Sequence, residues 1–149
     1  MTGTDKTDLK IIDALKENGR ATASEISRKV NLSVPAVSER IRKMEEAEVI
    51  ENYTVKVNRE KLNYKLLVFI FVIVDETDNI ENFRKTVVQY PSVLECHHLA
   101  GEYDYLLKVL LEDTKALEQF ISHQLRAIKG VNKINTTIAL STLKESINV

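Results

Sequence analysis

The stretch TASEISRKVNLSVPAVSERIRKMEEAEV, from Thr22 to Val49, decides the fold of the first third of the chain. It reads as two short helices joined by a polar turn. Thr22 and Glu25 have the spacing of a capping box, which opens the first of these helices. Ser33 is expected to cap the second, because Pro35 then falls in the first turn, where its missing amide donor breaks no hydrogen bond. Two helices in this order are typical of a helix-turn-helix, which places its second helix in the major groove of DNA.

Charge is distributed unevenly along this motif, although the formal net charge of the 149-residue chain is only −1. Residues 28–43 contain five basic residues and one acidic residue, whereas residues 44–51 contain four glutamates. A basic patch attracts the phosphate backbone of DNA, and an acidic block beside it limits non-specific binding. The local pattern therefore supports DNA binding, which the overall charge does not.

The second helix has an apolar side and a polar side. Val37, Ile41 and Met44 recur at helical spacing and are predicted to face the core. Arg42 and Lys43 could pair with glutamates one turn away, but exposed pairs of this kind are worth only about 0.3–0.5 kcal/mol, and DNA outcompetes them. For Arg40, on the flank, phosphate contact and coverage of the core by its alkyl stem remain open. The residues expected to contact DNA are Ser33, Pro35, Ala36, Ser38, Glu39, Arg40, Arg42 and Lys43.

The segments on either side of the motif complete a predicted winged helix-turn-helix domain over residues 1–58. A first helix is expected to begin after an N-cap at Thr7 and to end at Asn18-Gly19, with the glycine in a left-handed conformation. Residues 50–58 alternate between polar and apolar side chains and predict a β-strand in the wing. The polar residues 59–64 form the predicted linker.

Residues 65–149 follow a different pattern, which predicts a ferredoxin-like βαββαβ domain and an α+β protein overall. Strands are predicted at residues 66–74, 93–99, 105–111 and 131–143, with one helix that stops before Pro91 and another that Thr114 caps and Gly130 closes. Both helices of such a domain cover one face of the sheet. Residues 66–74 are nevertheless apolar throughout, so the uncovered face is expected to meet a second copy of the chain in a homodimer. Two helix-turn-helix units on a two-fold axis would bind a pseudo-palindromic site on double-stranded DNA.

The order of short motifs along the chain resembles the Lrp/AsnC (feast/famine) family of transcriptional regulators. The first half carries NGRA at 18–21, Leu32-Ser33, Val37-Ser38, Arg40-Ile41 and Val49-Ile50 before Tyr53. The second half carries VLEC at 93–96 and AGEYDYLL at 100–107, which looks like the Gly-x-x-Asp-Tyr turn of the family's regulatory (RAM-type) domain. The resemblance covers residues 8–142 in matching order and spacing.

This resemblance implies a sequence-specific regulator that forms dimers through its second domain and often assembles into octamers. It also implies that a small effector, typically an amino acid, shifts assembly or DNA affinity; no other cofactor is implied. The resemblance places this effector in a cleft lined by Gly101, Glu102, Tyr103 and Asp104, with Thr136 and Thr137 from the last strand. Asp104 would hold the ammonium group of the effector. Its alternative role is to stabilise the turn by bonding local amides.

The chain departs from the family pattern at Glu48, where a glycine usually precedes Val49-Ile50. A glycine there takes the left-handed conformation after the recognition helix. Glu48 can adopt that conformation only at some energetic cost, unless the helix ends differently.

Metal and catalytic chemistry are less well supported by the residues. Cys96, His97 and His98 are adjacent, but only two of them can share a face of a strand, whereas zinc needs at least three protein ligands. Glu102 and Asp104 lack a nucleophile–base arrangement, so the chain is not expected to be an enzyme. The alternatives are a small enzyme on a dimeric ferredoxin-like barrel, using His97 or His98, and a DNA-organising protein that has no effector.

The chain is expected to act in the cytoplasm, without a membrane partner. Its polar amino terminus has no visible signal peptide. Its longest apolar run, residues 66–74, is much shorter than the roughly 20 residues that span a bilayer. Its single cysteine excludes an internal disulfide, which fits a reducing compartment.

Overall fold

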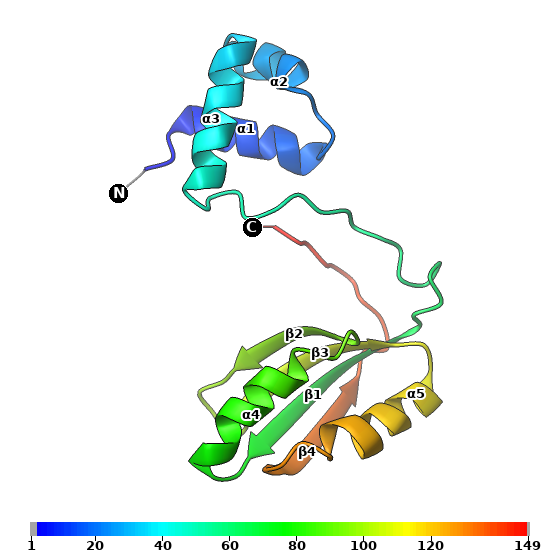
Figure 1. The fold of residues 1–149 in the computed structure, drawn as a ribbon. Helices are drawn as coiled ribbons and strands as arrows, with labels where there is room; N and C mark the ends of the chain where they lie inside the picture. The colour runs from blue at the N-terminus through cyan, green and yellow to red at the C-terminus, as the bar shows by residue number, and fades with distance from the viewer. Residues whose placement is uncertain (1–2, 149) are drawn as a thin grey trace. The chain divides into compact units, whose positions relative to one another are not determined.

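The computed structural model describes residues 3–148, which form two compact units (Figure 1). The first unit runs to Val57 and includes the chain from Ser146, and the second spans Asn58–Glu145. Residues 59–64 form a tight turn, in which the Tyr64 amide donates to the Arg59 carbonyl over 2.9 Å. Each unit has its own hydrophobic core.

The first unit consists of three helices, as the sequence predicts: α1 (Lys6–Glu17), α2 (Ala23–Val30) and α3 (Val34–Glu46). Both predicted caps of the helix-turn-helix are confirmed. Thr22 and Glu25 form a capping box at α2, and the Ser33 hydroxyl accepts from the Ala36 amide at 3.3 Å. The core between the helices is built from Ile11, Ala14, Ile26, Val37 and Met44.

The helix α1 ends at Glu17 with Asn18 as its C-cap, as predicted, but its start and the conformation of Gly19 differ from the prediction. The helix begins after Asp5 and not after Thr7, because the Asp5 carboxylate accepts from the amides of Thr7 (2.7 Å) and Asp8 (2.9 Å). At the other end, Gly19 does not take a left-handed conformation. The Asn18 side chain accepts from the Arg20 amide at 3.0 Å, and this turn redirects the chain without a left-handed residue.

The end of α3 has the left-handed residue that the family resemblance implies at position 48. Glu48 has a φ of 54°. The Val49 amide donates to the Met44 carbonyl (2.8 Å) and the Glu48 amide to the Glu45 carbonyl (3.0 Å). These two bonds are the Schellman pattern, in which glycine is the favoured left-handed residue. Glu48 therefore occupies a glycine position.

Replacing Glu48 with glycine is expected to raise the free energy of unfolding by roughly 0.5–1 kcal/mol. A non-glycine residue in this conformation costs about 1–2 kcal/mol, and the entropy that glycine adds to the unfolded chain offsets part of the gain. Urea unfolding measures the difference. The matched control is Ala47→Gly, one residue earlier at a φ of −86°, which should lower stability. A lower free energy of unfolding in E48G would contradict the view that Glu48 is strained in this conformation.

The predicted wing strand at residues 50–58 is wrong for the single chain. No residue of this segment forms a strand in the structure. Val55 is 75% exposed, and Tyr53 and Val57 are more than half exposed. A strand needs a neighbour to hydrogen-bond, and residues 50–58 belong to no sheet among the described residues. The sequence of this segment alternates between polar and apolar side chains, but the segment does not pair with another strand in the structure.

The second unit has the predicted βαββαβ order. Its elements are β1 (Leu66–Val74), α4 (Thr77–Val87), β2 (Val93–His98), β3 (Tyr105–Leu111), α5 (Thr114–Gln119), which continues as the π-helix η1 (Phe120–Leu125), and β4 (Val131–Ile138). The strands form one antiparallel sheet in the order β2-β3-β1-β4. This is the ferredoxin-like arrangement.

Four element boundaries in this unit differ from the prediction. The second helix, predicted to be closed by Gly130, ends at Leu125, and residues 126–130 form a turn before β4. The last strand stops at Ile138 and not at residue 143, because Ile138 already pairs with Val68 and β1 begins only two residues earlier. The strand predicted at 93–99 ends at His98. Asp113 and not Thr114 caps α5, since the Asp113 carboxylate accepts from the Ala116 amide at 2.8 Å.

The sheet has a covered face and an open face. On the covered face, Val68, Ile70 and Val72 are fully buried in a core with Phe83 of α4 and Leu125 of η1. Figure 1 shows α4 and α5 on the same side of the sheet. The open face is defined here by the alternate residues of β1 and β3, which are mostly half-buried: Leu67, Phe69, Phe71, Ile73, Leu106, Lys108 and Leu110.

Candidate nucleic-acid interface and ligand turn

The recognition helix α3 presents most of its predicted DNA contacts to solvent. Ser33, Pro35, Ser38, Glu39, Arg42 and Lys43 are exposed, whereas Ala36 and Arg40 are half-buried. Val37 and Met44, on the opposite side, are buried in the core as predicted. Six of these eight side chains are therefore exposed to solvent, and five of them belong to the polar side of α3, since Ser33 is its N-cap.

On this surface, Arg42 is held by two glutamates of its own helix. Arg42 Nε and Nη2 donate to the two carboxylate oxygens of Glu39, at 2.9 and 2.8 Å, and Nη1 donates to Glu46. Lys43 also lies 3.7 Å from Glu39. The hydrogen bonds from Arg42 lower the pKa of Glu39 to about 2. The sequence offers two ion pairs within the helix as an alternative to DNA contact, Glu39–Lys43 and Arg42–Glu46. Both are present in the structure.

Arg40 behaves differently from its neighbours, because it pairs with another helix. Its Nη1 donates to Asp8 Oδ1 (2.7 Å) and to Asp5 Oδ2 (2.8 Å) at the start of α1. Neither aspartate was predicted as a partner of Arg40. Their i, i+3 spacing was a usable signal, because it is the spacing of a capping box.

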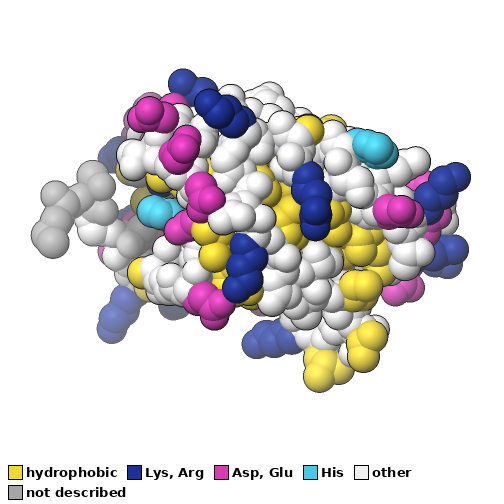
Figure 2. All heavy atoms as spheres, turned by 90° about the horizontal axis from the view of Figure 1, so that it is seen from below, with side chains coloured by type: hydrophobic (Ala, Val, Ile, Leu, Met, Phe, Trp, Pro, Cys, Tyr) yellow, Lys and Arg dark blue, Asp and Glu magenta, His cyan; other side chains and the backbone are white. Residues whose placement is uncertain are grey.

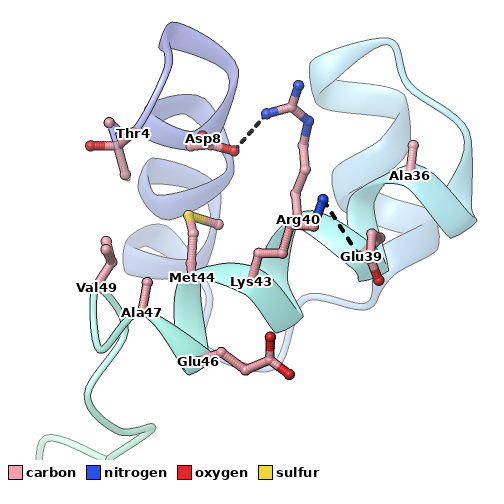
Figure 3. A pocket seen from close by; sticks show the side chains of 11 residues that line it. Thr4, Asp8, Ala36, Glu39, Arg40, Lys43, Met44, Glu46, Ala47 and Val49 are labelled. Carbon is pink, nitrogen blue, oxygen red and sulfur yellow. Dashed lines mark hydrogen bonds and ion pairs between the residues drawn. The ribbon is translucent and has the colours of Figure 1, made fainter. Parts of the chain in front are cut away.

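A groove of about 770 Å³ lies between the start of α1 and α3 (Figure 3). Arg40 and Asp8 meet in it, and the Lys43–Glu39 pair lies further along α3. Its lining combines acidic and basic side chains with a few apolar ones: Gly3, Thr4, Asp8, Ala36, Glu39, Arg40, Lys43, Met44, Glu46, Ala47 and Val49.

The turn at Gly101–Asp104 is anchored to the end of β1 through Asp104. Asp104 Oδ2 accepts from the Val74 amide at 2.9 Å, and the Asp104 amide donates to the Val72 carbonyl at 3.0 Å. Asp104 thus stabilises the fold by bonding an amide, although on a neighbouring strand and not within the turn. This contact does not occupy Oδ1.

The other two side chains of the turn contact β4. Glu102 pairs with Lys133 at 3.0 Å, and the Lys133 ammonium lies 5.0 Å from the centre of the Tyr103 ring. The Tyr103 hydroxyl accepts from Asn135 Nδ2 at 3.2 Å, and its ring packs against Phe71. Phe71 and Asn135 are opposite each other in the β1–β4 register, so this cluster lies on the open face.

The two threonines predicted for the same site point to opposite sides of the sheet. Thr137 is opposite Phe69 and shares the open face with the turn cluster. Thr136 is opposite Ile70, which is fully buried on the covered face. Successive residues of a strand alternate between faces, so adjacent threonines cannot both face one surface. The structure groups Thr137, and not Thr136, with Tyr103.

Cys96, His97 and His98 do not assemble a metal site. His97 pairs with Glu95 (3.1 Å), whereas His98 stacks on Tyr105 and approaches Arg84. Burial raises the pKa of the Cys96 thiol. Among residues 3–148, no three His, Cys, Asp or Glu side chains are grouped to hold a metal ion. Over the same range, no helix is both long and apolar enough to cross a membrane.

Comparisons with known proteins agree with both halves of this arrangement. Residues 4–51 match the family described as winged helix-turn-helix DNA-binding, and residues 67–149 match the Lrp/AsnC ligand binding domain. The Bkd operon transcriptional regulator of Pseudomonas aeruginosa is 32% identical over 145 residues, which cover 96% of this chain and 95% of that protein. The leucine-responsive regulatory protein of Escherichia coli is 32% identical over 95% of this chain and 88% of its own length.

Solved structures extend the likeness to the whole fold. A transcriptional regulator of Neisseria meningitidis in complex with L-methionine is 34% identical, with a TM-score of 0.94 over 99% of this chain and 96% of that one. A feast or famine regulatory protein of M. tuberculosis, also complexed with L-methionine, is 27% identical, with a TM-score of 0.91 over 99% of both chains. The chain therefore belongs to the Lrp/AsnC family, whose members combine this helix-turn-helix with this ligand-binding domain, and it is a DNA-binding transcriptional regulator.

Proposed function

We propose that α3 enters the major groove and that its exposed side chains make the DNA contacts. The carrying observation is that Ser38, Arg42 and Lys43 share one solvent-facing surface whose ion pairs all lie within α3. These pairs can be exchanged for phosphate or base contacts without moving another element. Arginine suits bidentate pairing with guanine, and lysine suits a phosphate.

Glu39 acts in this proposal as a brake on non-specific binding. It holds Arg42 through two hydrogen bonds and lies close to Lys43, so it neutralises part of the charge that DNA must attract. The variant Glu39→Gln is expected to strengthen binding to mixed-sequence duplex DNA by roughly three- to tenfold, because a like charge leaves the phosphate-facing surface.

Fluorescence anisotropy at two salt concentrations measures this effect. The matched control is Glu81→Gln, which breaks the exposed Glu81–Lys85 pair on α4 and should leave DNA binding unchanged. Equal affinities for the two variants would contradict a role of Glu39 at the DNA surface.

The turn at 101–104 is proposed to bind an amino acid. L-methionine complexes of two similar proteins support this class of ligand. Asp104 Oδ1 suits an ammonium group, because Oδ2 is already fixed by the Val74 amide and holds the carboxylate in place. Tyr103 contacts Asn135 of β4, and Thr137 lies two residues further along the same face of that strand. Gly101 leaves room for a ligand beside the backbone, since no atom lies within 4 Å of a Cβ placed there.

A thermal-shift screen across the amino acids tests the effector proposal. A ligand at 100 times its dissociation constant should stabilise the protein by about 2.7 kcal/mol, which raises the melting temperature by several degrees. Asp104→Asn should abolish the shift, and Asp113→Asn, a cap of α5 away from the turn, should retain it. A flat screen would instead favour a DNA-organising role without an effector.

The open face of the sheet is proposed as the dimer interface. Phe69, Phe71 and Ile73 are only half-buried in the single chain, whereas their neighbours on the covered face are fully buried. Figure 2 shows hydrophobic side chains that reach the surface between charged ones on one side of the molecule. A second copy would bury such a face and place two α3 helices on a two-fold axis, which suits a pseudo-palindromic site. We also propose that the dimers assemble further into an octamer. The chain is proposed to have no catalytic activity and to act in the cytoplasm.

A further inference from the structure

Arg40 connects the recognition helix to the first turn of α1. Nη1 donates to Asp8 Oδ1 at 2.7 Å and to Asp5 Oδ2 at 2.8 Å, and Figure 3 shows the Arg40–Asp8 contact within the groove. The Asp8 side chain is only 14% exposed and Arg40 is 34% exposed, whereas Arg42 is 53% exposed. The contact is therefore better shielded from solvent than the ion pairs on the DNA-facing surface.

The two aspartates carry out a second task at the same time. Asp5 Oδ1 accepts from the amides of Thr7 and Asp8, and Asp8 Oδ2 accepts from the Asp5 amide at 3.0 Å. Each of the four carboxylate oxygens thus has a partner, either the cap of α1 or Arg40. The guanidinium is joined to the feature that defines where α1 begins, so the contact fixes α3 against a rigid point.

The local charge argues against a phosphate contact. Two carboxylates surround one guanidinium, so Asp5, Asp8 and Arg40 together carry a net charge of −1. A phosphate that approached Arg40 would meet both carboxylates. Arg42 and Lys43 face no acidic side chain from α1 among the described ion pairs.

We infer that Arg40 is a positioning residue, which sets the orientation of α3 in the major groove through Asp5 and Asp8 and does not itself contact DNA. This inference rests on the proposed DNA surface of α3. The orientation of a recognition helix decides which of its side chains reach base edges, so the Arg40–Asp contact contributes to discrimination between sequences. The Arg40–Asp contact contributes little to the electrostatic attraction between the protein and DNA of any sequence.

The test uses the full chain with Arg40→Ala, Arg40→Lys, Asp8→Asn and the double variant R40A/D8N. Asp13→Asn is the matched control, because Asp13 is an acidic residue of α1 that pairs only with Lys16 among the ion pairs described for it. The probes are a duplex that the wild-type protein selects from a random pool and a mixed-sequence duplex of the same length. The measured quantities are the ratio of the two affinities, the salt dependence of each, and the free energy of unfolding.

R40A is expected to lower the affinity ratio about tenfold, and D8N should lower it by a smaller factor, because Arg40 keeps its bond to Asp5 in D8N. The double variant should lower the ratio no further than R40A, which already removes both bonds of the guanidinium. R40K should retain most of the ratio, and D13N all of it. The slope of log affinity against log salt on mixed-sequence DNA should stay unchanged in R40A.

A slope reduced by about 0.9 in R40A, but not in D8N, would overturn the inference and assign Arg40 to a phosphate. A lower stability with an unchanged affinity ratio would also overturn it, because the contact would then serve only the fold. If the wild-type protein selected no duplex, the DNA surface itself would be wrong. The free energies of unfolding of R40A, D8N and the double variant would still test the contact itself. If the losses of the two single variants add up in the double variant, Arg40 and Asp8 act independently.

Discussion

Replacing Arg42 and Lys43 together with alanine is expected to weaken DNA binding by roughly 30- to 1,000-fold, or about 2–4 kcal/mol. Arg42 supplies the only guanidinium on the exposed side of α3, and Lys43 supplies its neighbouring ammonium. Their removal also leaves Glu39 and Glu46 without their partners, facing the phosphates. Both effects act in the same direction.

The salt dependence separates this loss from a general loss of structure. Each lost phosphate contact should reduce the slope of log affinity against log salt by about 0.9, which is the change expected from the loss of Lys43. A reduction of about 1.8 would show that Arg42 also contacts a phosphate and not only a base. The control Lys85→Ala removes an equally exposed lysine, paired with Glu81 on α4, and should change neither affinity nor slope. Full-strength binding with an unchanged slope in R42A/K43A would show that DNA contacts another surface.

Gly130→Ala is expected to destabilise the second unit by roughly 3–5 kcal/mol, a large fraction of the 5–15 kcal/mol typical of a whole domain. Gly130 has a φ of +89°, which strains any L side chain. A Cβ there would lie 2.4 Å from the Cβ of Asn79, which is buried. Asn79 has little room to move, because its Nδ2 donates to the Asp75 carbonyl at 3.0 Å.

Urea unfolding measures this loss, and Gly19→Ala is its matched control. Gly19 has no positive φ, and the nearest atom to a Cβ built there is 4.0 Å away, so alanine should be nearly neutral. Adding Asn79→Ala to G130A should restore little, because the closest contact involves the Cβ that alanine retains. A loss below about 1 kcal/mol in G130A would show that the segment between η1 and β4 relaxes.

The sequence was sufficient for features that depend on neighbouring residues. The capping box at Thr22 and the cap at Ser33 follow from spacing within one or two turns, and the structure confirms both. The unusual position of Glu48 followed instead from the family resemblance, and its positive φ agrees with it. β1 was predicted to the residue, because nine consecutive apolar residues admit few alternatives. Errors fell where tertiary partners decide: residues 50–58 alternate like a strand but pair with no strand of the described residues.

The site residues show the same division. An amphipathic helix reveals its exposed face, so the surface that carries Arg42 and Lys43 could be predicted from period alone. The partners of Arg40 lie 32 and 35 residues away, and no local pattern joins them. Thr136 and Thr137 show how resemblance can group residues that geometry separates, since adjacent strand positions face opposite ways.

The intrahelical ion pairs of α3 have a consequence for the speed of operator capture. Glu39, Arg42 and Glu46 are exposed and belong to one helix, so releasing the guanidinium requires side-chain rotamer changes alone. Such changes take picoseconds to nanoseconds at exposed positions, far less than the time between diffusive encounters. On the proposed DNA surface of α3, association then meets no conformational gate, and its rate should be governed by diffusion and electrostatic steering.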